Sequence, residues 1–280
     1  MSERRYVHLR IFLLPENQLG YRTWIKFFCR RFCMLKTYDE TFTLLTRDCD
    51  LKGTWRLSAI LEAMQEAAGA HSLLLGCGRD ELLKKDIVWV LSRSELHMQR
   101  YPRIGEKITL HTFPMPNRVY FFPRYYLFTD ERGELIGKAG TLWLLLDINT
   151  RKMLPPGDIA HLIPDNRDLT VPMNLPATVG SLQGDEFVTE YTPVYSDLDV
   201  NGHVNNARYA DWLCNTLGID LMSCNNPETI ILNYNHEILP GQTVTLHRIL
   251  RDRQYRLAGH VDGGTPAFEI GGFLQPLSHS

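Results

Sequence analysis

The sequence predicts an α+β fold of two tandem units, in each of which a curved antiparallel sheet wraps around one long helix. Two observations lead to this prediction. A strand-like segment, a long helical segment and several further strand-like segments follow one another twice along the chain. Between the two series, residues 151–184 contain five prolines and no sustained periodicity, which is typical of a linker. A lone helix can bury its apolar stripe only against the sheet of its own unit, so that sheet is expected to curve around it.

The first unit is expected at residues 37–150. Residues 41–46 are rich in Thr, Phe and Leu, which is typical of a strand. Residues 55–76 are rich in good helix formers, and their apolar residues recur at the spacing of one helix face. These apolar positions are Leu57, Ile60, Leu61, Met64, Ala67 and Ala68. Further strands are expected at 87–98, 106–113, 119–129 and 135–148.

The second unit is expected at residues 185–276 and repeats this order. A strand at 186–194 precedes a turn-rich stretch and a helix at 207–222. The apolar face of that helix carries Tyr209, Trp212, Leu213, Thr216 and Leu217. Further strands are expected at 228–237, 243–250, 253–261 and 267–274. A long helix wrapped by a curved antiparallel sheet is the hotdog fold, and two tandem hotdog domains can pair their sheets edge to edge, which removes one exposed edge from each.

Composition narrows the class of protein. The chain has 280 residues and a formal net charge of −2, which excludes a strongly basic nucleic-acid binder. No run of apolar residues is long enough to predict a membrane span. Among the six cysteines, Cys29 and Cys33 have loose metal-ligand spacing but no second pair at partner spacing, so we expect reduced thiols, no metal and a cytoplasmic location. Residues 1–36 contain only two acidic residues among many Arg and Lys, and we expect a basic N-terminal extension without a catalytic part.

The densest polar cluster lies at residues 197–209, just before the second predicted helix. Asn205 or Asn206 is expected to cap that helix, as Asn often does. His203 is less typical of a simple cap. The D-x-N-x-H spacing of Asp199, Asn201 and His203 would place three polar side chains on one side of an extended segment, which favours a functional site over a solvated loop.

The cluster DLDVNGHVNNARYADW (197–212) resembles the signature of acyl-acyl carrier protein (ACP) thioesterases, a family known from plant plastids and bacteria. ILEAMQEAAGAHSLLLG (60–76) resembles the family's first hotdog helix, and IVWVLSRSEL (87–96) the strand after it. GTLWLLLDINTRKMLPP (140–156) resembles the end of its first hotdog domain. The resemblance covers residues 37–275. It implies hydrolysis of fatty acyl-ACP to free fatty acid and holo-carrier protein, without a cofactor, by a protein that can form a homodimer.

The resemblance also implies site residues. Asp199, Asn201 and His203 match the family's Asp, Asn and His, and Glu237 matches its catalytic Glu. The family's Cys that follows this Glu is replaced by Ile238, which favours direct attack by water over a thiol nucleophile. Glu237 and His203 are expected to activate the water, Asn201 to bind the developing oxyanion and Asp199 to orient Asn201. Which of Glu237 and His203 takes the proton stays open. Free N–H groups at the helix start, residues 203–206, are expected to help.

The family resemblance further implies an acyl tunnel in the first hotdog domain, between its helix and its sheet. Candidates for its lining are Met64, Ala68, Trp89, Leu91 and Phe122, although core packing explains each of them equally well. Gln65, Glu66 and His71 are expected at a helix end that faces the linker or solvent. The first half is expected to lack an equivalent of D-x-N-x-H. We therefore expect the chemistry in the second half and the choice of chain length in the first.

Three other functions compete with this one. An acyl-CoA thioesterase would use the same chemistry, and a basic surface for either carrier is expected from Lys84, Lys85, Arg118, Arg124, Arg151 and Arg208. A dehydratase also uses hotdog domains but has a different motif. A non-catalytic acyl-binding protein belongs to another class, and the presence of all four motif residues argues against it.

Overall fold

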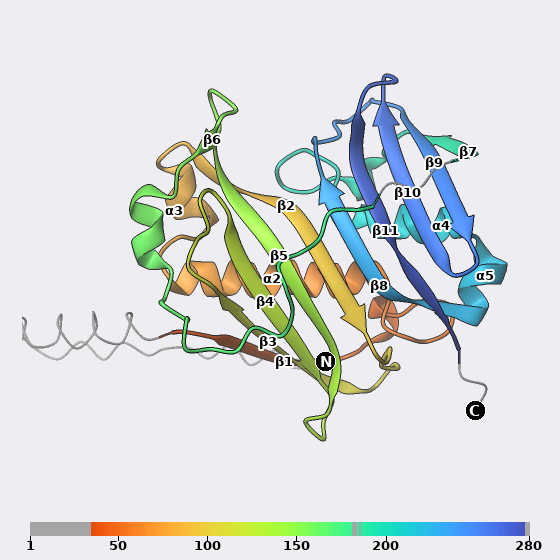
Figure 1. Cartoon of the computed structure of the whole chain (residues 1–280), viewed down its shortest axis with the longest axis horizontal. Helices are drawn as coiled ribbons and strands as arrows, with labels where there is room; N and C mark the ends of the chain where they lie inside the picture. Colours follow the sequence, from red (N-terminus) through yellow and green to blue (C-terminus); the bar gives the residue numbers. More distant parts are fainter. Residues whose placement is uncertain (1–34, 181–183, 185, 278–280) are drawn as a thin grey trace, which may run out of the picture. The chain divides into compact units, whose positions relative to one another are not determined.

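A single antiparallel sheet of eleven strands runs through both halves of the protein (Figure 1). The computed structural model describes residues 35–180, 184 and 186–277. The first half contributes β1 (Tyr38–Thr43), β2 (Ile87–Met98), β3 (Lys107–Pro114), β4 (Phe122–Thr129), β5 (Leu135–Asp147) and β6 (Met153–Leu154). The second half contributes β7 (Glu186–Tyr191), β8 (Asn225–Tyr234), β9 (Val244–Arg251), β10 (Gln254–Val261) and β11 (Pro266–Pro276). The order across the sheet is β1-β3-β4-β5-β2-β8-β11-β10-β9-β7, with β6 added to β5.

The two halves join where β2 pairs with β8. Five residue pairs, from Arg93 opposite Asn233 to His97 opposite Thr229, hold this antiparallel register. Each strand would otherwise be an exposed edge with unpaired backbone groups, and their pairing removes both edges. The expected edge-to-edge pairing of two hotdog sheets is confirmed.

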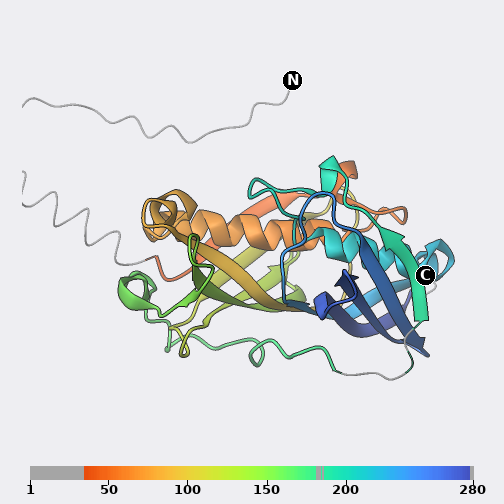
Figure 2. The same ribbon diagram turned by 90° about the horizontal axis from the view of Figure 1, so that it is seen from above.

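Both long helices lie on one face of this sheet (Figure 2). They are α2 (Leu57–Leu74) and α4 (Arg208–Leu217), and every apolar position expected on their buried faces is less than 10% exposed. The two faces pack into one hydrophobic core with residues from both halves of the sheet. The hydrophobic periodicity therefore identified both core faces correctly, because a helix in contact with a sheet must present its apolar stripe to it.

Where α2 and α4 meet, the contact is polar. Ser58 Oγ donates a 2.5 Å hydrogen bond to Asp211 Oδ1, and Arg208 Nη1 donates to Asp211 Oδ2 over 2.7 Å. Arg208 also pairs with Glu62 on α2. Arg208 had been a candidate for a basic docking surface, and this expectation is wrong: its charge is balanced inside the junction between the two helices.

The proline-rich segment between the halves crosses the opposite face of the sheet (Figure 2). The Ala177 amide donates to Glu95 Oε2 over 2.8 Å, and Lys138 Nζ donates to the Pro172 carbonyl over 3.1 Å. Glycines in β5 and β11 provide the space: a Cβ at Gly140 or Gly271 would lie 3.4 Å or 3.0 Å from linker side chains. The segment also contains β6 and a short 3₁₀ helix, η2 (Gly157–Leu162), which the composition had not predicted.

Element boundaries differ from the expected ones for local reasons. β1 ends at Thr43 because a 3₁₀ turn, η1 (Thr46–Asp48), follows it and Asp48 Oδ2 accepts the Leu45 amide over 2.9 Å. The second helix divides at Gly218, whose φ of +91° is accessible to glycine, into α4 and α5 (Ile219–Cys224). A short helix, α3 (Arg79–Leu83), and a 3₁₀ turn, η3 (Tyr195–Asp197), complete the list.

The N-terminal extension expected at residues 1–36 lies outside the described residues except for Leu35 and Lys36. Lys36 Nζ pairs with Asp168 over 2.8 Å. The Leu35 carbonyl lies 3.0 Å from His71 Nε2. In the part of the chain that the structure describes, no helix is both long enough and apolar enough to cross a membrane.

His71, on α2, and Arg124, on β4, form a buried pair between the helix and the sheet. His71 is fully buried, so the expectation that it faces the linker or solvent is wrong. Arg124 Nη1 donates to His71 Nδ1 over 3.1 Å, and this leaves the ring proton on Nε2, which donates to Leu35. Burial, with a contribution from the Arg124 charge, lowers the pKa of His71 to about 4. The imidazole is therefore neutral at physiological pH.

This pair predicts acid sensitivity of the fold. As pH falls from about 6.5 towards 4, unfolded His71 takes up a proton that the folded protein does not bind, so the free energy of unfolding should decrease by roughly 3 kcal/mol. In His71→Gln, the carboxamide can still accept from Arg124 and donate to Leu35 without titrating. Chemical denaturation of both proteins across this pH range should show a smaller loss in the variant. Equal pH dependence of the two would contradict the assignment.

Candidate functional site

The predicted motif forms a tight turn, residues 197–204, which we call the second-half turn. The Asp199 amide donates to the His203 carbonyl over 2.8 Å, and the Gly202 amide donates back to the Asp199 carbonyl over 3.0 Å. Gly202 has φ +79°, which suits glycine. The expectation of an extended segment with alternating side chains is thus wrong, because these hydrogen bonds fold the chain back on itself.

Within this turn, Asp199 holds Asn201 in place. Asp199 Oδ1 accepts the Asn201 amide over 2.8 Å, and Oδ2 accepts the side-chain Nδ2 over 3.2 Å. One Nδ2 hydrogen is therefore used by Asp199, and the second is left for another acceptor. The arrangement fits an orienting role for Asp199.

A backbone hydrogen bond joins the turn to the segment that carries Glu237. The Val204 amide donates to the Ile238 carbonyl over 2.9 Å. This places His203 Nε2 3.4 Å from Glu237 Oε2, with both side chains about one-third exposed. Residues 34 positions apart thus meet as an imidazole and a carboxylate, the pair of groups needed to position and deprotonate a water molecule.

A third charged group in this cluster comes from the other half. Arg151, in the tight connection between β5 and β6, pairs through Nη2 with Glu237 Oε2. Asp147 Oδ1 shapes this connection by accepting the Asn149 and Thr150 amides over 3.0 and 2.7 Å. Arg151 had been considered only as part of a basic surface. Its contact with Glu237 was not predicted, because it depends on how the two halves are joined.

Fewer backbone N–H groups at the start of α4 are free to bind substrate than expected. The Val204 and Asn205 amides donate to the Ile238 and Asp197 carbonyls. Asn205 Oδ1 accepts the Ala207 amide over 2.9 Å, so Asn205 supports the helix start as expected. Two of the four amides proposed to assist the reaction are therefore already paired within the protein.

No described cysteine lies where a nucleophile would be needed. Ile238 is fully buried in the core, unlike its neighbour Glu237, whose side chain is about one-third exposed. Burial raises the pKa of Cys77 to about 11 and that of Cys214 to about 12, which disfavours the reactive thiolate. Cys214 packs partly buried against the core, as expected.

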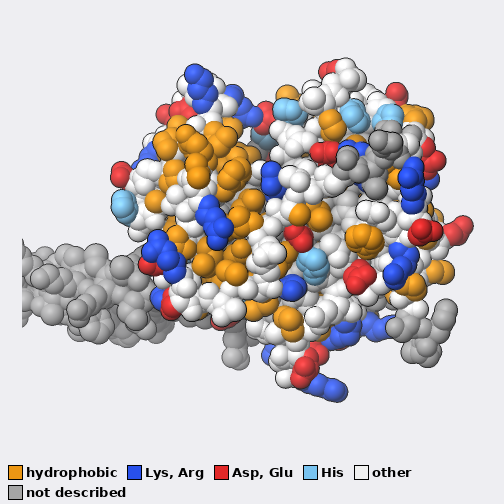
Figure 3. Space-filling model, viewed as in Figure 1, with side chains coloured by type: hydrophobic (Ala, Val, Ile, Leu, Met, Phe, Trp, Pro, Cys, Tyr) orange, Lys and Arg blue, Asp and Glu red, His pale blue; other side chains and the backbone are white. Residues whose placement is uncertain are grey.

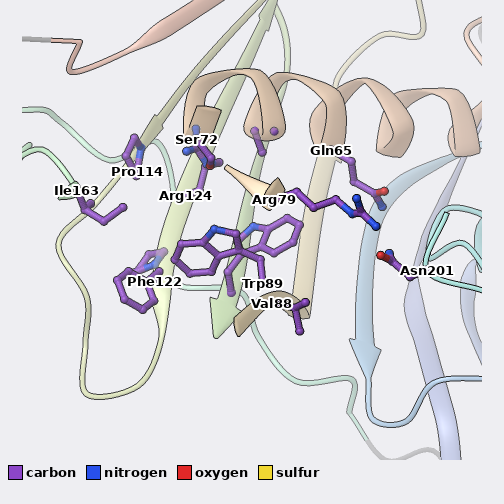
Figure 4. A pocket seen from close by; sticks show the side chains of 14 residues that line it. Gln65, Ser72, Arg79, Val88, Trp89, Pro114, Phe122, Arg124, Ile163 and Asn201 are labelled. Atoms are coloured by element: carbon purple, nitrogen blue, oxygen red, sulfur yellow. The ribbon is translucent and has the colours of Figure 1, made fainter. Parts of the chain in front are cut away.

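An apolar pocket of about 200 Å³ lies between α2 and the first-half sheet; we call it the α2 pocket (Figure 4). Asn201, from the other half, and Gln65, from α2, lie side by side at one end of it (Figure 4). Trp89 and Phe122 form part of its wall, with ring centroids 4.9 Å apart and planes at 86°. Gln65 had been given a solvent-facing role, and its place opposite Asn201 was missed because the sequence does not show which helix the second-half turn contacts.

Three of the five residues expected to line an acyl tunnel, Ala68, Trp89 and Phe122, line this pocket. Met64 and Leu91 do not: they are 2% and 4% exposed and lie outside the lining, Met64 within the shared core. Both lie on apolar faces of regular elements, and periodicity alone does not separate a core position from a pocket position.

The first half contains the same turn at residues 48–55. The Asp50 amide donates to the Thr54 carbonyl over 2.9 Å, as the Asp199 amide does to His203. The Trp55 amide donates to the Pro102 carbonyl over 2.9 Å, as the Val204 amide does to Ile238. The first half therefore has the backbone of this turn but, as expected, not the D-x-N-x-H residues. The equivalent pairs are Asp50 and Asp199, Lys52 and Asn201, Thr54 and His203, and Tyr101 and Glu237.

The side chains of this first-half turn are engaged with one another. Lys52 Nζ lies 2.8 Å from Asp50 Oδ2 and donates to the Met222 carbonyl over 2.7 Å. The Tyr101 hydroxyl, where the second half has Glu237, donates to the Pro227 carbonyl over 2.8 Å. Neither a carboxylate nor an imidazole takes the place of a base here, so the two turns differ in chemistry and not in backbone.

The six cations considered for a carrier-docking surface do not behave as one group. Arg124 is 5% exposed, and Arg208 is paired between the helices. Lys84 is exposed and pairs with Glu81 over 2.8 Å. On the face shown in Figure 3, Lys and Arg side chains are scattered, and hydrophobic side chains gather over β4 and β5. A basic docking surface made of all six is therefore excluded.

Both halves of the chain match models of one protein family. Residues 35–159 match the family model of the acyl-ACP thioesterase N-terminal domain, and residues 180–263 match that of the C-terminal domain. A chloroplastic acyl-[acyl-carrier-protein] hydrolase of Cuphea viscosissima is 24% identical over 214 residues, which are 71% of this chain and 52% of the relative. A palmitoyl-acyl carrier protein thioesterase of Arabidopsis thaliana is 25% identical over 220 residues, 71% of this chain and 52% of that protein. The chain spans about half the length of these relatives.

Solved structures share the fold. An acyl-ACP thioesterase from Bacteroides thetaiotaomicron is similar with a TM-score of 0.78 and 24% identity, over 86% of this chain and 98% of that one. A 12:0-ACP thioesterase from Umbellularia californica has a TM-score of 0.72 and 21% identity, over the same shares of the two chains. The double hotdog fold predicted from the sequence is confirmed. With both of its family models matched in order along most of its length, this chain belongs to the acyl-acyl carrier protein thioesterase family.

Proposed function

We propose that this protein hydrolyses fatty acyl-ACP thioesters to free fatty acid and holo-carrier protein. One observation carries the proposal: Asn201 lies at the end of an apolar pocket, and the same turn brings His203 within 3.4 Å of Glu237. A water-activating pair thus sits beside a compartment suited to an acyl chain. The names of the family relatives support the same reaction.

In the proposed reaction, water attacks the thioester carbonyl carbon and gives up a proton to the Glu237–His203 pair. Arg151 and His203 both approach Oε2 of Glu237, so Oε1 is the oxygen left to accept a hydrogen bond from the water. The ion pair with Arg151 holds the carboxylate in place beside His203. We therefore assign Glu237 as the base and His203 as the group that fixes its orientation and that of the water.

The carbonyl oxygen becomes negative as water attacks, and donors placed in advance stabilise it. The Asn201 hydrogen that Asp199 does not use, and the Gln65 carboxamide beside it, are the proposed donors. The tetrahedral intermediate then collapses, the carbon–sulfur bond breaks and the phosphopantetheine thiolate leaves. A thiol with a pKa near 8.5 needs little protonation to depart, so no dedicated acid is required.

We further propose that the two halves divide the work, with the chemistry at 185–276 and the acyl chain held at 37–150. The first-half turn has lost the base and the imidazole, whereas the first-half helix and sheet form the α2 pocket. The carrier protein is the proposed partner. An acyl-CoA thioesterase would use the same groups, so assays with both carriers distinguish the two functions.

Glu237→Gln should lower kcat for acyl-ACP hydrolysis by at least about 10²-fold, the scale of a lost general base. The substitution keeps the size of the side chain and removes its basicity. Glu228→Gln, at an exposed position on β8, is the matched control and should keep the normal rate. Steady-state assays with folded variants test this. A near-normal rate in Glu237→Gln would exclude the carboxylate as the base.

Ala68→Phe should shift the product profile towards shorter fatty acids. Ala68 lines the α2 pocket, and each methylene displaced from an apolar site costs about 0.8 kcal/mol, so one larger side chain changes preference by a few carbons. Asn215→Phe, on α4 beside the first-half turn, is the control for the other half. Products from mixed acyl-ACP substrates are compared by gas chromatography. A shift caused by Asn215→Phe and not by Ala68→Phe would place the acyl chain in the second half.

A further inference from the structure

The α2 pocket ends at a buried cation. Arg124, on β4, lines the pocket at the end opposite Asn201 and Gln65, next to Ser72 (Figure 4). Its side chain is 5% exposed. Trp89 lies between the two ends, and Phe122 lies on the side of Pro114 and Ile163 (Figure 4). A plain hydrocarbon chain entering from Asn201 would bring its methyl end to a guanidinium group, although the middle of the pocket is apolar.

The Arg124 charge is not balanced inside the protein. Nη1 donates to His71 Nδ1 over 3.1 Å and to Thr112 Oγ1 over 3.2 Å. Both acceptors are neutral, because His71 keeps its proton on Nε2 for the Leu35 carbonyl. Among the ion pairs of residues 35–180, 184 and 186–277, none includes Arg124. His71 and Thr112 occupy one terminal nitrogen and hold the guanidinium in place.

A buried charge without a counter-ion is costly, and arginine keeps its proton under such conditions. Apolar residues of similar volume pack such positions as well or better. Arg208, a partly exposed cation at the junction of the two helices, is by contrast matched by Glu62 and Asp211. The unpaired guanidinium at the pocket end therefore indicates a ligand that supplies the missing acceptor.

We propose that Arg124 binds an oxygen substituent near the distal end of the acyl chain, so that the preferred substrates are ω-oxygenated acyl thioesters, with a terminal carboxylate bound most strongly. The inference rests on the proposed thioesterase function, because it places the thioester carbonyl at Asn201. The aromatic wall of the pocket holds the methylenes, and the guanidinium fork donates hydrogen bonds to the oxygens at the end.

The test compares acyl-ACPs of equal chain length that end in a methyl group, a hydroxyl group or a carboxylate. Sites built to bind a polar group reject analogues that lack it, so wild-type kcat/KM should favour the carboxylate-ended chain by about 10²-fold. Arg124→Met should abolish or reverse this preference while retaining hydrolysis of the methyl-ended chain. Arg124→Lys should keep part of it. Arg118→Met, an exposed arginine outside the pocket lining, should keep the wild-type ratio.

A second measurement does not depend on folding of the variants. Titration calorimetry of the wild-type protein with dicarboxylic and monocarboxylic fatty acids of equal length should show tighter binding of the dicarboxylic acids. Equal or weaker binding, or a wild-type preference for methyl-ended acyl-ACP that Arg124→Met leaves unchanged, would overturn the inference. Hydrolysis of no acyl-ACP at all, together with tighter binding of dicarboxylic acids, would instead reject the proposed function and leave the Arg124 subsite standing.

Discussion

The antiparallel pairing of β2 with β8 is the contact on which the rest of the structure depends. It joins the two sheets into one and sets α2 and α4 end to end on the same face (Figure 2). The helices then meet through Arg208, Glu62 and Asp211. As a result the turn of each half lies against the helix of the other: Asn201 reaches the pocket beneath α2, and Lys52 the pocket beside α4. A single hotdog unit has no such composite site.

The two turns share a backbone and differ in side chains, so they separate the residues that the fold requires from those that the chemistry requires. An aspartate at the first position of each, Asp50 or Asp199, accepts the amide two residues later and closes the turn. That role is structural in both halves. The chemistry depends on the positions of Asn201, His203 and Glu237, which in the first half hold Lys52, Thr54 and Tyr101. The same backbone turn thus supports a polar site in the second half, whereas in the first half its side chains are used in hydrogen bonds within the protein.

Two arginines of this protein show two kinds of charge pairing. Arg208 is partly exposed and forms ion pairs with Glu62 and Asp211 at the junction of the helices. Arg124 is held by the neutral His71 and Thr112 and carries an unbalanced charge into an apolar pocket. The first kind follows from the cost of burying a charge, and the second makes sense only with a ligand. The neutral form of His71 has two effects. It stabilises the fold, and it leaves the charge of the Arg124 guanidinium without a counter-charge.

The sequence by itself determined the features that depend on neighbours along the chain. Helix faces repeat every three to four residues and strands are bounded by Gly and Pro, so the order of elements, the buried faces of α2 and α4 and the hotdog class were all predicted. The short motif around Asp199 and His203 identified the family, and both family models match. Boundaries shifted where a local hydrogen bond decided them, as at Asp48 and Leu45.

Only the tertiary structure decided which side chains meet. Arg151 contacts Glu237 across 86 positions, Gln65 lies opposite Asn201, and Arg124 is inside the molecule and not on its surface. These contacts depend on the register of β2 against β8 and on the course of tight turns, and neither leaves a periodic trace in the sequence. The sequence does not distinguish an arginine on the surface from an arginine at the end of a pocket. The physical difference is its surroundings, which come from residues far away in the chain.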